Sequence, residues 1–401
     1  MVAARTVIVA GAGIGGLTAA LALARRGFEV TLLEAAPRLQ EIGAGLQLSP
    51  NAARVLIALG IEHQLKPHVV IPEQLVVRSA RSRRLLAQAP LGASVAQRYG
   101  APYWVIHRGD LQAALCETVA ATPGITLKLG SKVESFAPRD GGVAVAAAQG
   151  SQPLEQQGMA LVAADGLWST LRQRLGHRAP PRAAGQTAWR TLVPADAVPK
   201  GSAESFAAPA VNLWLGHDAH LVHYPVKAGR MINVVAIAND DWREPGWNTP
   251  GTTRELLDRF AAEHWHGSAR DLLAASEHWQ KWALFDCPPL AAWGEGPVTL
   301  IGDAAHPMLP YLAQGAAMAI EDAAVLAACL ARNPDDAPAA LRRYEASRLP
   351  RTTRVQRDAR HNGTVYHMRG AAAALRSLAL MAMGGDRLIS RYDWLYGWSP
   401  S

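Results

Sequence analysis

A glycine-rich turn between a short apolar run and a helical pattern constrains the fold of this chain more than any other feature. Residues 5–10 read RTVIVA and are followed by GAGIGG and then by LTAALALARRG, whose apolar spacing is helical up to Gly27. Residues 29–34 (EVTLLE) predict a second strand. A strand, a tight glycine turn, a helix and a strand within about 30 residues predict a Rossmann-like unit with a parallel sheet.

The same unit predicts a dinucleotide site. Its glycines allow a pyrophosphate to approach the helix N-terminus, and Glu34 ends the second strand, where a carboxylate can accept hydrogen bonds from a ribose. The turn alone does not distinguish an NAD site from an FAD site. The residues expected at this site are Gly11, Gly13, Ile14, Gly15, Gly16 and Glu34.

Two later strand ends carry an aspartate beside a glycine. Residues 159–163 (MALVA) run into Asp165-Gly166, and residues 297–301 (PVTLI) run into Gly302-Asp303. Open α/β sheets bind ligands at the carboxyl ends of their strands, so both pairs are candidate cofactor contacts. Taken singly, Asp165 also suits an Asp-Gly turn and Asp303 an ordinary helix cap.

The chain changes character between residues 183 and 285, where period-2 segments alternate with turns. This pattern predicts an antiparallel sheet lobe inserted into a discontinuous nucleotide-binding lobe. Residues 75–87 and 125–147 suggest hairpins or a small β-layer. Helices are expected near 313–331, 337–362 and 371–384. The predicted fold is therefore mixed α/β, with a Rossmann-like lobe at 1–182, a substrate sheet at 183–285, a return of the first lobe at 286–365 and a helical segment at 366–401.

Composition excludes several classes of protein. Of 401 residues, 49% are hydrophobic and 18% charged, which suits a large core and excludes wholesale disorder. No apolar run reaches the ~18 residues of a membrane span. The three cysteines are far apart, so we expect a reduced cytoplasmic protein without a metal site. The net charge is +7, but the arginines are scattered, so a nucleic-acid partner is not expected.

Three separated motifs occur in one order: GAGIGG at residue 11, ADGLWSTLR at residue 164 and GDAAHPMLPYLAQGAAMAIEDA at residue 302. In this combination the chain resembles the single-component flavoprotein aromatic hydroxylases, over roughly residues 5–365. The sequences of these motifs are similar to those of salicylate hydroxylases, 3-hydroxybenzoate 6-hydroxylases and 6-hydroxynicotinate 3-monooxygenases. The resemblance implies bound FAD that is reduced by NADH or NADPH, reacts with O₂ to a flavin C4a-hydroperoxide, and hydroxylates a phenolic aromatic acid.

The resemblance also implies roles for cofactor-binding residues. Gly11, Gly13 and Gly16 would cradle the FAD pyrophosphate, and Glu34 would hold the adenosine ribose. Asp165-Gly166 would touch FAD and the nicotinamide cofactor, and Asp303, after Gly302, would bind the ribityl chain. The remaining residues placed at the flavin by this likeness are Arg108, Gln314, Gly315, Ala316 and Ala317.

A histidine-rich segment, HDAHLVHYP at residues 217–225, is the best candidate for the substrate face. Residues four apart in a strand share a face, so His220 and Tyr224 lie together and His223 lies opposite. A neutral histidine is a suitable base for a phenol near pH 7. The resemblance to 3-hydroxybenzoate 6-hydroxylases places the catalytic histidine at His220 and a nearby tyrosine at Tyr224.

Four other residues are candidate substrate contacts. Gln47 stands where hydroxynicotinate enzymes have histidine, and Pro310 where 3-hydroxybenzoate enzymes have glutamine, so both depart from those patterns. Arg190 is the candidate for carboxylate recognition, although its inward face is not readable from the strand pattern. His306 suits either a substrate contact or a capping role. By contrast, Arg348, Arg351 and Arg354 have the i, i+3 spacing typical of a solvated helix face.

Alternatives remain open at this point. A hydroxypyridine carboxylate would serve as substrate in the same fold, and an FAD oxidoreductase need not insert oxygen. A non-catalytic nucleotide-binding protein would keep the fold without turnover. The apolar run at 371–383 suggests a buried or dimer-facing helix, and a homodimer is expected.

Overall fold

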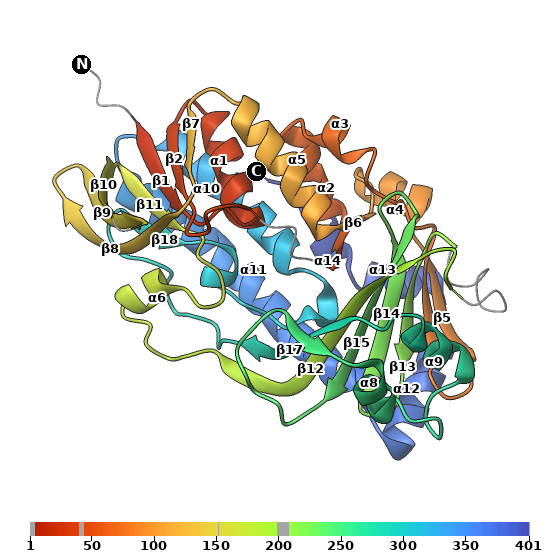
Figure 1. Cartoon of the computed structure of the whole chain (residues 1–401). Helices are drawn as coiled ribbons and strands as arrows, with labels where there is room; N and C mark the ends of the chain where they lie inside the picture. Colours follow the sequence, from red (N-terminus) through yellow and green to blue (C-terminus); the bar gives the residue numbers. More distant parts are fainter. Residues whose placement is uncertain (1–4, 40–43, 151, 199–207, 401) are drawn as a thin grey trace.

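A parallel five-stranded sheet carries the glycine-rich turn. The computed structural model describes residues 5–39, 44–150, 152–198 and 208–400 (Figure 1). The strand order of this sheet is β18-β11-β1-β2-β7. Its strands come from distant parts of the sequence, namely β1 (Thr6–Ala10), β2 (Glu29–Leu33), β7 (Ile125–Lys128), β11 (Ala160–Ala163) and β18 (Val298–Leu300). The carboxyl ends of β1, β11 and β18 therefore lie side by side at one edge.

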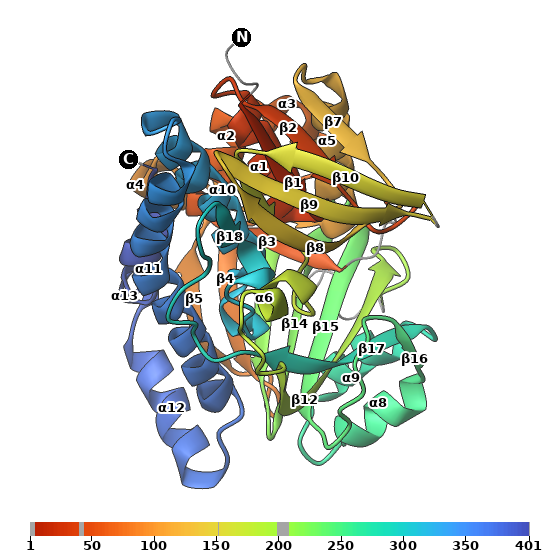
Figure 2. The same ribbon diagram turned by 90° about the vertical axis from the view of Figure 1, so that its left-hand side faces the viewer.

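Helices and a small sheet bury the two faces of this parallel sheet. Helix α1 follows the glycine turn and packs against α10 and α5, while a three-stranded antiparallel sheet packs against β1, β2 and β11 (Figure 2). Buried aliphatic side chains fill the space between these layers. The elements are α1 (Ile14–Ala24), α2 (Pro50–Ala58), α5 (Arg108–Ala121), α10 (Gly315–Arg332), β8 (Ser131–Arg139), β9 (Gly142–Gln149) and β10 (Gln152–Gly158).

An eight-stranded sheet forms the second lobe, in the order β16-β17-β12-β15-β14-β13-β4-β5. Every neighbouring pair is antiparallel except β13 and β4, which are parallel. Its strands are β4 (Gln74–Ser79), β5 (Leu85–Pro90), β12 (Arg182–Pro194), β13 (Ala210–Leu215), β14 (Ala219–Val226), β15 (Met231–Asn239), β16 (Thr249–Gly251) and β17 (Trp279–Asp286). The mixed α/β fold expected from the sequence, with a parallel sheet and an antiparallel one, is confirmed.

The hairpins expected within residues 75–87 and 125–147 are present as β4–β5 and β8–β9, but two of the strands have further partners that the pattern did not predict. The first segment forms the hairpin β4–β5, but β4 pairs with β13, so the hairpin extends the eight-stranded sheet. In the second segment, β7 joins the parallel sheet beside β2. Alternation reveals a strand but not its partner when that partner is more than a hundred residues away. The division of the chain into lobes at residues 182, 285 and 365 stays an expectation.

The two faces of the eight-stranded sheet have different partners. Trp189, Leu221 and Val234 point to one face and pack on helices α8 (Thr253–Arg259) and α9 (Gly267–Ala274). Because side chains alternate along a strand, their neighbours Arg190, His220 and Val222 point to the opposite face, toward the parallel-sheet lobe. A cavity lies on that side, between the two lobes.

The C-terminal part of the chain is helical. Helix α11 (Ala337–Tyr366) runs along both lobes and packs on α10, and α12 and α13 lie beside β5 (Figures 1 and 2). The remaining elements are α3 (Glu62–Leu65), α4 (Gly92–Tyr99), α6 (Thr170–Arg174), α12 (Gly370–Ala382), α13 (Gly385–Ser390), α14 (Asp393–Tyr396), the 3₁₀ turns η1 (Gly302–Ala304) and η2 (Pro310–Leu312), and the paired strands β3 (Gly45–Leu48) and β6 (Trp104–His107).

Helix α12 is not buried, so the buried alternative for the apolar run at 371–383 is wrong. Leu375 and Leu378 are 67% and 59% exposed. Among the residues that the structure describes, no helix combines the length and apolarity needed to cross a bilayer.

Candidate active site

The glycine turn after β1 is shaped by close backbone contacts. Gly11 has a φ of +107°, and a Cβ there would overlap the carbonyl oxygen of Ala164 at the end of β11. A Cβ on Gly16 would overlap the carbonyl oxygen of Gly11. Gly13 differs, because a Cβ there would meet no atom within 4 Å. Gly11 and Gly16 are therefore needed for the turn itself, whereas Gly13 borders open space.

This open space suits a phosphate group. Helix α1 starts at Ile14, and its N-cap residue Gly13 supplies no side-chain acceptor for the free N–H groups of the first turn. Ile14 and Gly15 line the cavity there. Glu34 accepts hydrogen bonds from the backbone N–H groups of Ala12 (2.6 Å) and Ala36 (2.8 Å). Each carboxylate oxygen keeps a further lone pair, so Glu34 is held beside the turn and can still accept from a ribose hydroxyl.

The two glycines give a matched pair of variants. Gly13→Ala should leave the thermal unfolding of the cofactor-free protein unchanged, because nothing in the protein opposes the added methyl. The methyl would occupy cofactor space, and overpacking of about 1–3 kcal/mol should weaken FAD binding roughly 5- to 150-fold. Gly16→Ala should instead lower stability by about 2 kcal/mol or more, because the methyl meets backbone. Fluorescence titration with FAD and thermal melts separate the two; equal FAD affinities for Gly13→Ala and wild type would contradict this assignment.

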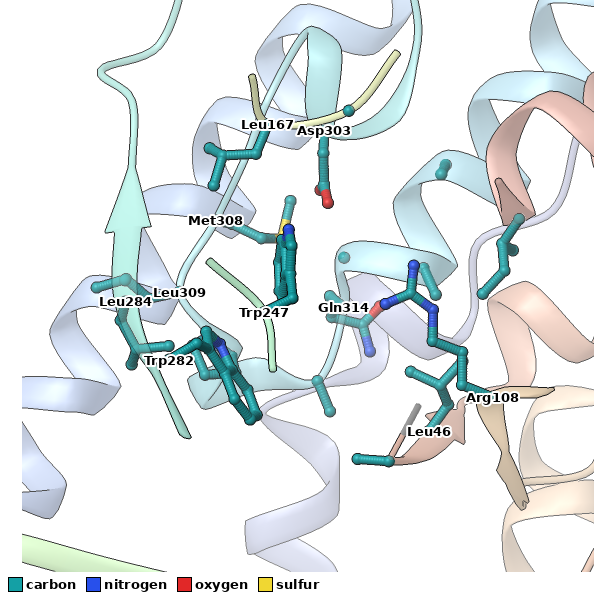
Figure 3. A pocket seen from close by; sticks show the side chains of 18 of the residues that line it. Leu46, Arg108, Leu167, Trp247, Trp282, Leu284, Asp303, Met308, Leu309 and Gln314 are labelled. Carbon is teal, nitrogen blue, oxygen red and sulfur yellow. The ribbon is translucent and has the colours of Figure 1, made fainter. Parts of the chain in front are cut away.

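Two aspartates lie at the carboxyl ends of β11 and β18, as the sequence predicted. Asp165 accepts a hydrogen bond from the Leu171 N–H through Oδ2 (3.1 Å), while its Oδ1 is buried without a partner among the described residues. The Asp303 carboxylate points into the cavity (Figure 3). Burial raises the pKa of Asp303, and His306, Arg108 and Arg172 partly offset this effect. Both carboxylates are available to the hydroxyl and N–H donors of a cofactor.

The N-terminus of α10 faces the same cavity. Its N-cap, Gln314, makes no capping hydrogen bond with its side chain, so the N–H groups of the first turn lack an internal partner. Gly315 and Ala316 line the cavity together with Gln314, and Arg108 lines it on the same side in Figure 3. Such an N-terminus stabilises negative charge on a bound ring. Ala317, expected here too, is fully buried and does not line the cavity.

The cavity between the lobes, called the main cavity below, has a volume of about 370 Å³. One end is formed by residues 13–15 and Asp303, and the other by Trp282 of the eight-stranded sheet and the neighbouring Trp247. Trp247 and Trp282 lie at that other end, across from Arg108 and Gln314 (Figure 3). Its remaining apolar lining comes mainly from Leu167, Trp168, Val222, Val235, Ile237, Leu284, Phe285, Met308 and Leu309.

His220 and Tyr224 both line the main cavity, as the strand pattern predicted, and His223 does not. His220 is 2% exposed, and burial together with the neighbouring His367 lowers its pKa well below the usual 6.5. Burial raises the pKa of Tyr224. A neutral imidazole and a protonated phenol therefore face the cavity. On the opposite face, His223 Nε2 accepts a hydrogen bond from the Trp214 indole N–H (3.0 Å).

Gln47 and Pro310 also line the main cavity. Gln47 Oε1 accepts a hydrogen bond from the hydroxyl of Tyr103 (2.7 Å), which fixes its amide beside Tyr224. Gly45 makes room for that ring, because a Cβ there would lie 2.9 Å from the Tyr224 hydroxyl oxygen.

The side chain of Arg190 lies on the face of β12 that borders the main cavity, and the residue is 5% exposed. Its guanidinium lies 4.6 Å from the centre of the Trp282 indole ring and donates to Asn248 Oδ1 (2.7 Å) and Trp247 O (3.1 Å). Both acceptors are neutral, and the Nε atom is buried without a partner among the described residues. Burial, reinforced by Arg108, lowers the pKa of Arg190 to about 10. This buried cation has no carboxylate to balance it in the described chain.

His306 is not a substrate contact, and that expectation is wrong. It is 1% exposed, does not line the main cavity, and bonds through Nε2 to Asp322 Oδ2 (2.5 Å). The same carboxylate oxygen accepts from the backbone N–H of Gly302 (3.1 Å). His306 therefore helps to hold the turn that carries Asp303.

A buried ionic cluster behind α10 was missed by the sequence analysis. Arg348, expected on a solvated face, is buried and contacts Glu321 (2.6 Å) and Asp322 (2.7 Å). Arg351 also pairs with Glu321 (2.7 Å). Burial lowers the pKa of Arg348, but the two carboxylates more than offset this and raise it. Only the segment EDAAVLAA after the glycines hinted at such partners, because its two acids fall within an otherwise apolar helix.

This cluster is connected to the cofactor end of the cavity. Asn51 on α2 donates to Glu321 Oε1 (2.7 Å) and to Gln314 Oε1 (3.1 Å). Gln314 in turn donates to the hydroxyl of Ser49 (2.9 Å). The cluster thereby fixes the first turn of α10 and the Gly302 turn relative to each other.

The residues at the first end of the main cavity fit an FAD molecule: a glycine turn bordering open space, two aspartates at strand ends, and a helix N-terminus for the flavin. No group of His, Cys, Asp and Glu side chains in the described ranges is arranged to hold a metal ion.

Comparison with known proteins agrees with this geometry. Residues 4–359 match the family model described as an FAD binding domain. The chain is 38% identical to a 3-hydroxybenzoate 6-hydroxylase of Aquipseudomonas alcaligenes, over 98% of this chain and 97% of that protein. It is 39% identical to a 3-amino-4-hydroxybenzoate 2-monooxygenase of Streptomyces platensis, over 98% and 96%.

A solved structure is similar over the same span. A salicylate hydroxylase in complex with its substrate superposes with a TM-score of 0.82 at 29% identity, covering 98% of this chain and 96% of that one.

Proposed function

Because the chain belongs to the FAD-dependent aromatic hydroxylases, we propose that it hydroxylates the ring of a hydroxybenzoate held between Arg190 and His220. The observation that carries this proposal is the buried guanidinium of Arg190, whose partners are neutral oxygens. An aromatic carboxylate would balance its charge and leave the ring against Trp282 and the apolar lining. The names of the hydroxybenzoate-specific relatives support the same substrate class.

FAD supplies the oxygen chemistry when it is bound and reduced by NADH or NADPH. The chain's own contribution at that end is to hold the cofactor. The turn at Gly11–Gly16 would take the pyrophosphate, Glu34 the ribose, Asp303 the ribityl chain, and the α10 N-terminus the flavin ring. Arg108 would add a positive charge beside it.

The strand register sets the spacing of the proposed substrate contacts. Arg190 on β12 pairs with Val235, and Val235 on β15 pairs with Val222 on β14. His220 lies two residues from Val222 along β14. Strands about 4.8 Å apart and a rise of about 3.4 Å per residue give ~12 Å between the Cα atoms of Arg190 and His220. Two inward side chains across that span leave room for one benzoate ring.

His220 is the proposed base for the phenol. Its neutral ring can take the phenol proton, and the phenolate is a better nucleophile than the phenol. The protonated hydroxyl of Tyr224, on the same strand face, would donate to the phenol oxygen. The apolar lining excludes water from the ring. Gln47 would orient Tyr224, and Pro310 would shape the wall beside it.

Arg190→Gln tests the carboxylate site. Loss of a charge-assisted hydrogen bond, about 1.5–3 kcal/mol, should raise KM for 3-hydroxybenzoate or salicylate roughly 10- to 100-fold with a smaller effect on kcat. The matched control is 3-hydroxybenzyl alcohol, which lacks the carboxylate and should react equally with both proteins. Steady-state NAD(P)H oxidation gives both constants. An unchanged KM for the carboxylated substrates would contradict the proposal.

We also infer a homodimer and a cytoplasmic location. The exposed leucines of α12 support the first, because an apolar pair at i, i+3 is costly in water. The need for NAD(P)H supports the second. Sedimentation should show a particle of about twice 42.8 kDa, and a monomer would contradict the dimer.

A further inference from the structure

A second cavity lies behind His220, on the side of the ring that faces His367. This outer cavity has a volume of about 410 Å³, and Leu309 and the neighbouring Tyr311 stand between it and the main cavity. Its rim includes Arg369 and Arg360, whose side chains are 61% and 37% exposed, so it is open to solvent. His367, the residue after α11, forms part of its wall.

The two cavities are joined by a hydrogen bond between two histidines. His220 Nδ1 lies 2.9 Å from His367 Nε2, and both rings are at least nine-tenths buried. Because Nδ1 is engaged, His220 has Nε2 left for a substrate in the main cavity. His367 in turn has Nδ1 on its other side, toward the outer cavity.

The partners of His367 Nδ1 allow either protonation state of that atom. Asn239 Oδ1 lies 3.1 Å away and can accept from an N–H there. Gln186 Nε2 lies 3.2 Å away and can donate to a bare nitrogen. The hydroxyl of Tyr311 donates to Gln186 Oε1, which directs the NH₂ group of that amide to the histidine. An acceptor and a donor at one nitrogen suit a ring that exchanges tautomers.

We propose that His367 relays a proton between His220 and the outer cavity, so that the phenol proton reaches solvent without a water molecule beside the substrate ring. The inference rests on the proposed function for the phenolic substrate and for His220 as its base. His367 does not touch the substrate. It holds the His220 ring through their hydrogen bond and passes the proton on from it.

The transfer balances in three bond exchanges. The phenol O–H breaks as a bond forms to His220 Nε2. The Nδ1–H of His220 then passes to His367 Nε2, and the Nδ1–H of His367 passes to water in the outer cavity. One proton enters and one leaves, and both rings end neutral with exchanged tautomers. When the hydroxylated ring becomes aromatic again, the former phenol oxygen takes a proton back along the same path, which resets both rings.

The surroundings of the pair keep both rings neutral before and after the transfer. His220 faces Tyr311 of η2, Tyr366 of α11 and His367. Burial lowers the pKa of His367 to about 4, with Arg376 of α12 adding to this and Asp218 opposing it. Both rings therefore rest neutral near pH 7. Asp218, which also pairs with Arg369, is the one carboxylate named here that favours a protonated His367.

His367→Ala tests the relay with FAD-loaded enzyme in weak buffer. Stopped-flow mixing with 3-hydroxybenzoate in the presence of a pH indicator measures proton release on binding. Wild type should release the proton quickly, and His367→Ala should do so about tenfold more slowly or worse. Imidazole added to the variant should restore the rate, because the lost ring borders an open cavity that imidazole can enter. Tyr366→Phe, which keeps an aromatic ring beside His220, is the matched control and should match wild type.

The outcomes separate the relay from a packing role and from the proposed function. Slow release that imidazole does not restore would show that His367 only packs against His220, and an unchanged rate would also overturn the relay. His367→Gln, of similar size, is the second variant if His367→Ala does not fold; it should be slow as well. If wild type hydroxylates no hydroxybenzoate, the proposed function fails; if it does and His367→Ala releases the proton at the wild-type rate, the relay alone fails.

Discussion

Replacing His220 with alanine is expected to slow hydroxylation of 3-hydroxybenzoate about 100-fold while FAD stays bound. General-base catalysis is worth ~10²–10⁴ in rate, and Tyr224 and Arg190 would still hold the substrate. Because the phenol bound to the variant is not ionised, a larger share of the O₂ consumed should be released as H₂O₂. Product formation and H₂O₂ are measured together in single-turnover mixing. Wild-type rate and coupling in the variant would show that His220 is not the base.

His223→Gln is the control for this variant. His223 lies on the same strand but on the face toward Trp214, away from the main cavity. Its replacement should leave the rate per folded molecule unchanged. A similar loss in both variants would indicate a disturbed strand rather than a missing base.

The pH dependence of kcat gives an independent check on the same residue. Burial and His367 hold the pKa of His220 well below 6.5, and the neutral ring is the active form. As pH falls through 6.5, wild-type kcat should therefore stay level and decline only at lower pH. A decline centred at 6.5 would indicate an ordinary exposed histidine instead.

Arg348→Met is expected to lower the free energy of unfolding by about 3 kcal/mol, because it removes the buried cation that Glu321 and Asp322 share and, in the described chain, leaves only Arg351 and His306 beside them. Glu321 and Asp322 are both fully buried, and Arg348 contacts each of them. The loss should also weaken FAD binding, since the cluster fixes Gln314 and the Gly302 turn. Urea unfolding and FAD titration measure the two effects.

Arg357→Ala is the matched control on the same helix. Its side chain is 71% exposed and its contact with Asp358 is 3.9 Å long. Such a surface pair contributes about 0–1 kcal/mol. Similar losses for Arg348 and Arg357 would show that the buried cluster does not stabilise the fold.

The parts of the site that the sequence predicted are those encoded by contiguous residues. GAGIGG fixes a strand, a turn and a helix start locally, and Asp165 and Asp303 follow buried strands directly. The alternation of AHLVHY likewise placed His220 and Tyr224 on one face. In each case the geometry depends on neighbours in the chain, so a short pattern is enough.

The parts that were missed depend on partners far away in the sequence. Arginines three residues apart on a helix, such as Arg348 and Arg351, can face either solvent or a buried cluster. Their spacing does not reveal that they pair with acids almost thirty residues earlier in the chain. His306 lies in a loop and its partner carboxylate on α10, and the partner of β4 is β13. The sequence around His367 contains no pattern that links it to His220, because only the packing of α11 on the sheet brings the two rings together.

We expect this chain to insert oxygen into a hydroxybenzoate. The most direct test mixes purified FAD-loaded protein with NADH or NADPH and 3-hydroxybenzoate or salicylate, and compares O₂ consumed with dihydroxylated product and H₂O₂ formed. One of these acids should stimulate NAD(P)H oxidation, with nearly one product formed per O₂ consumed. Stimulation that yields only H₂O₂, or none by any hydroxybenzoate, would contradict this expectation.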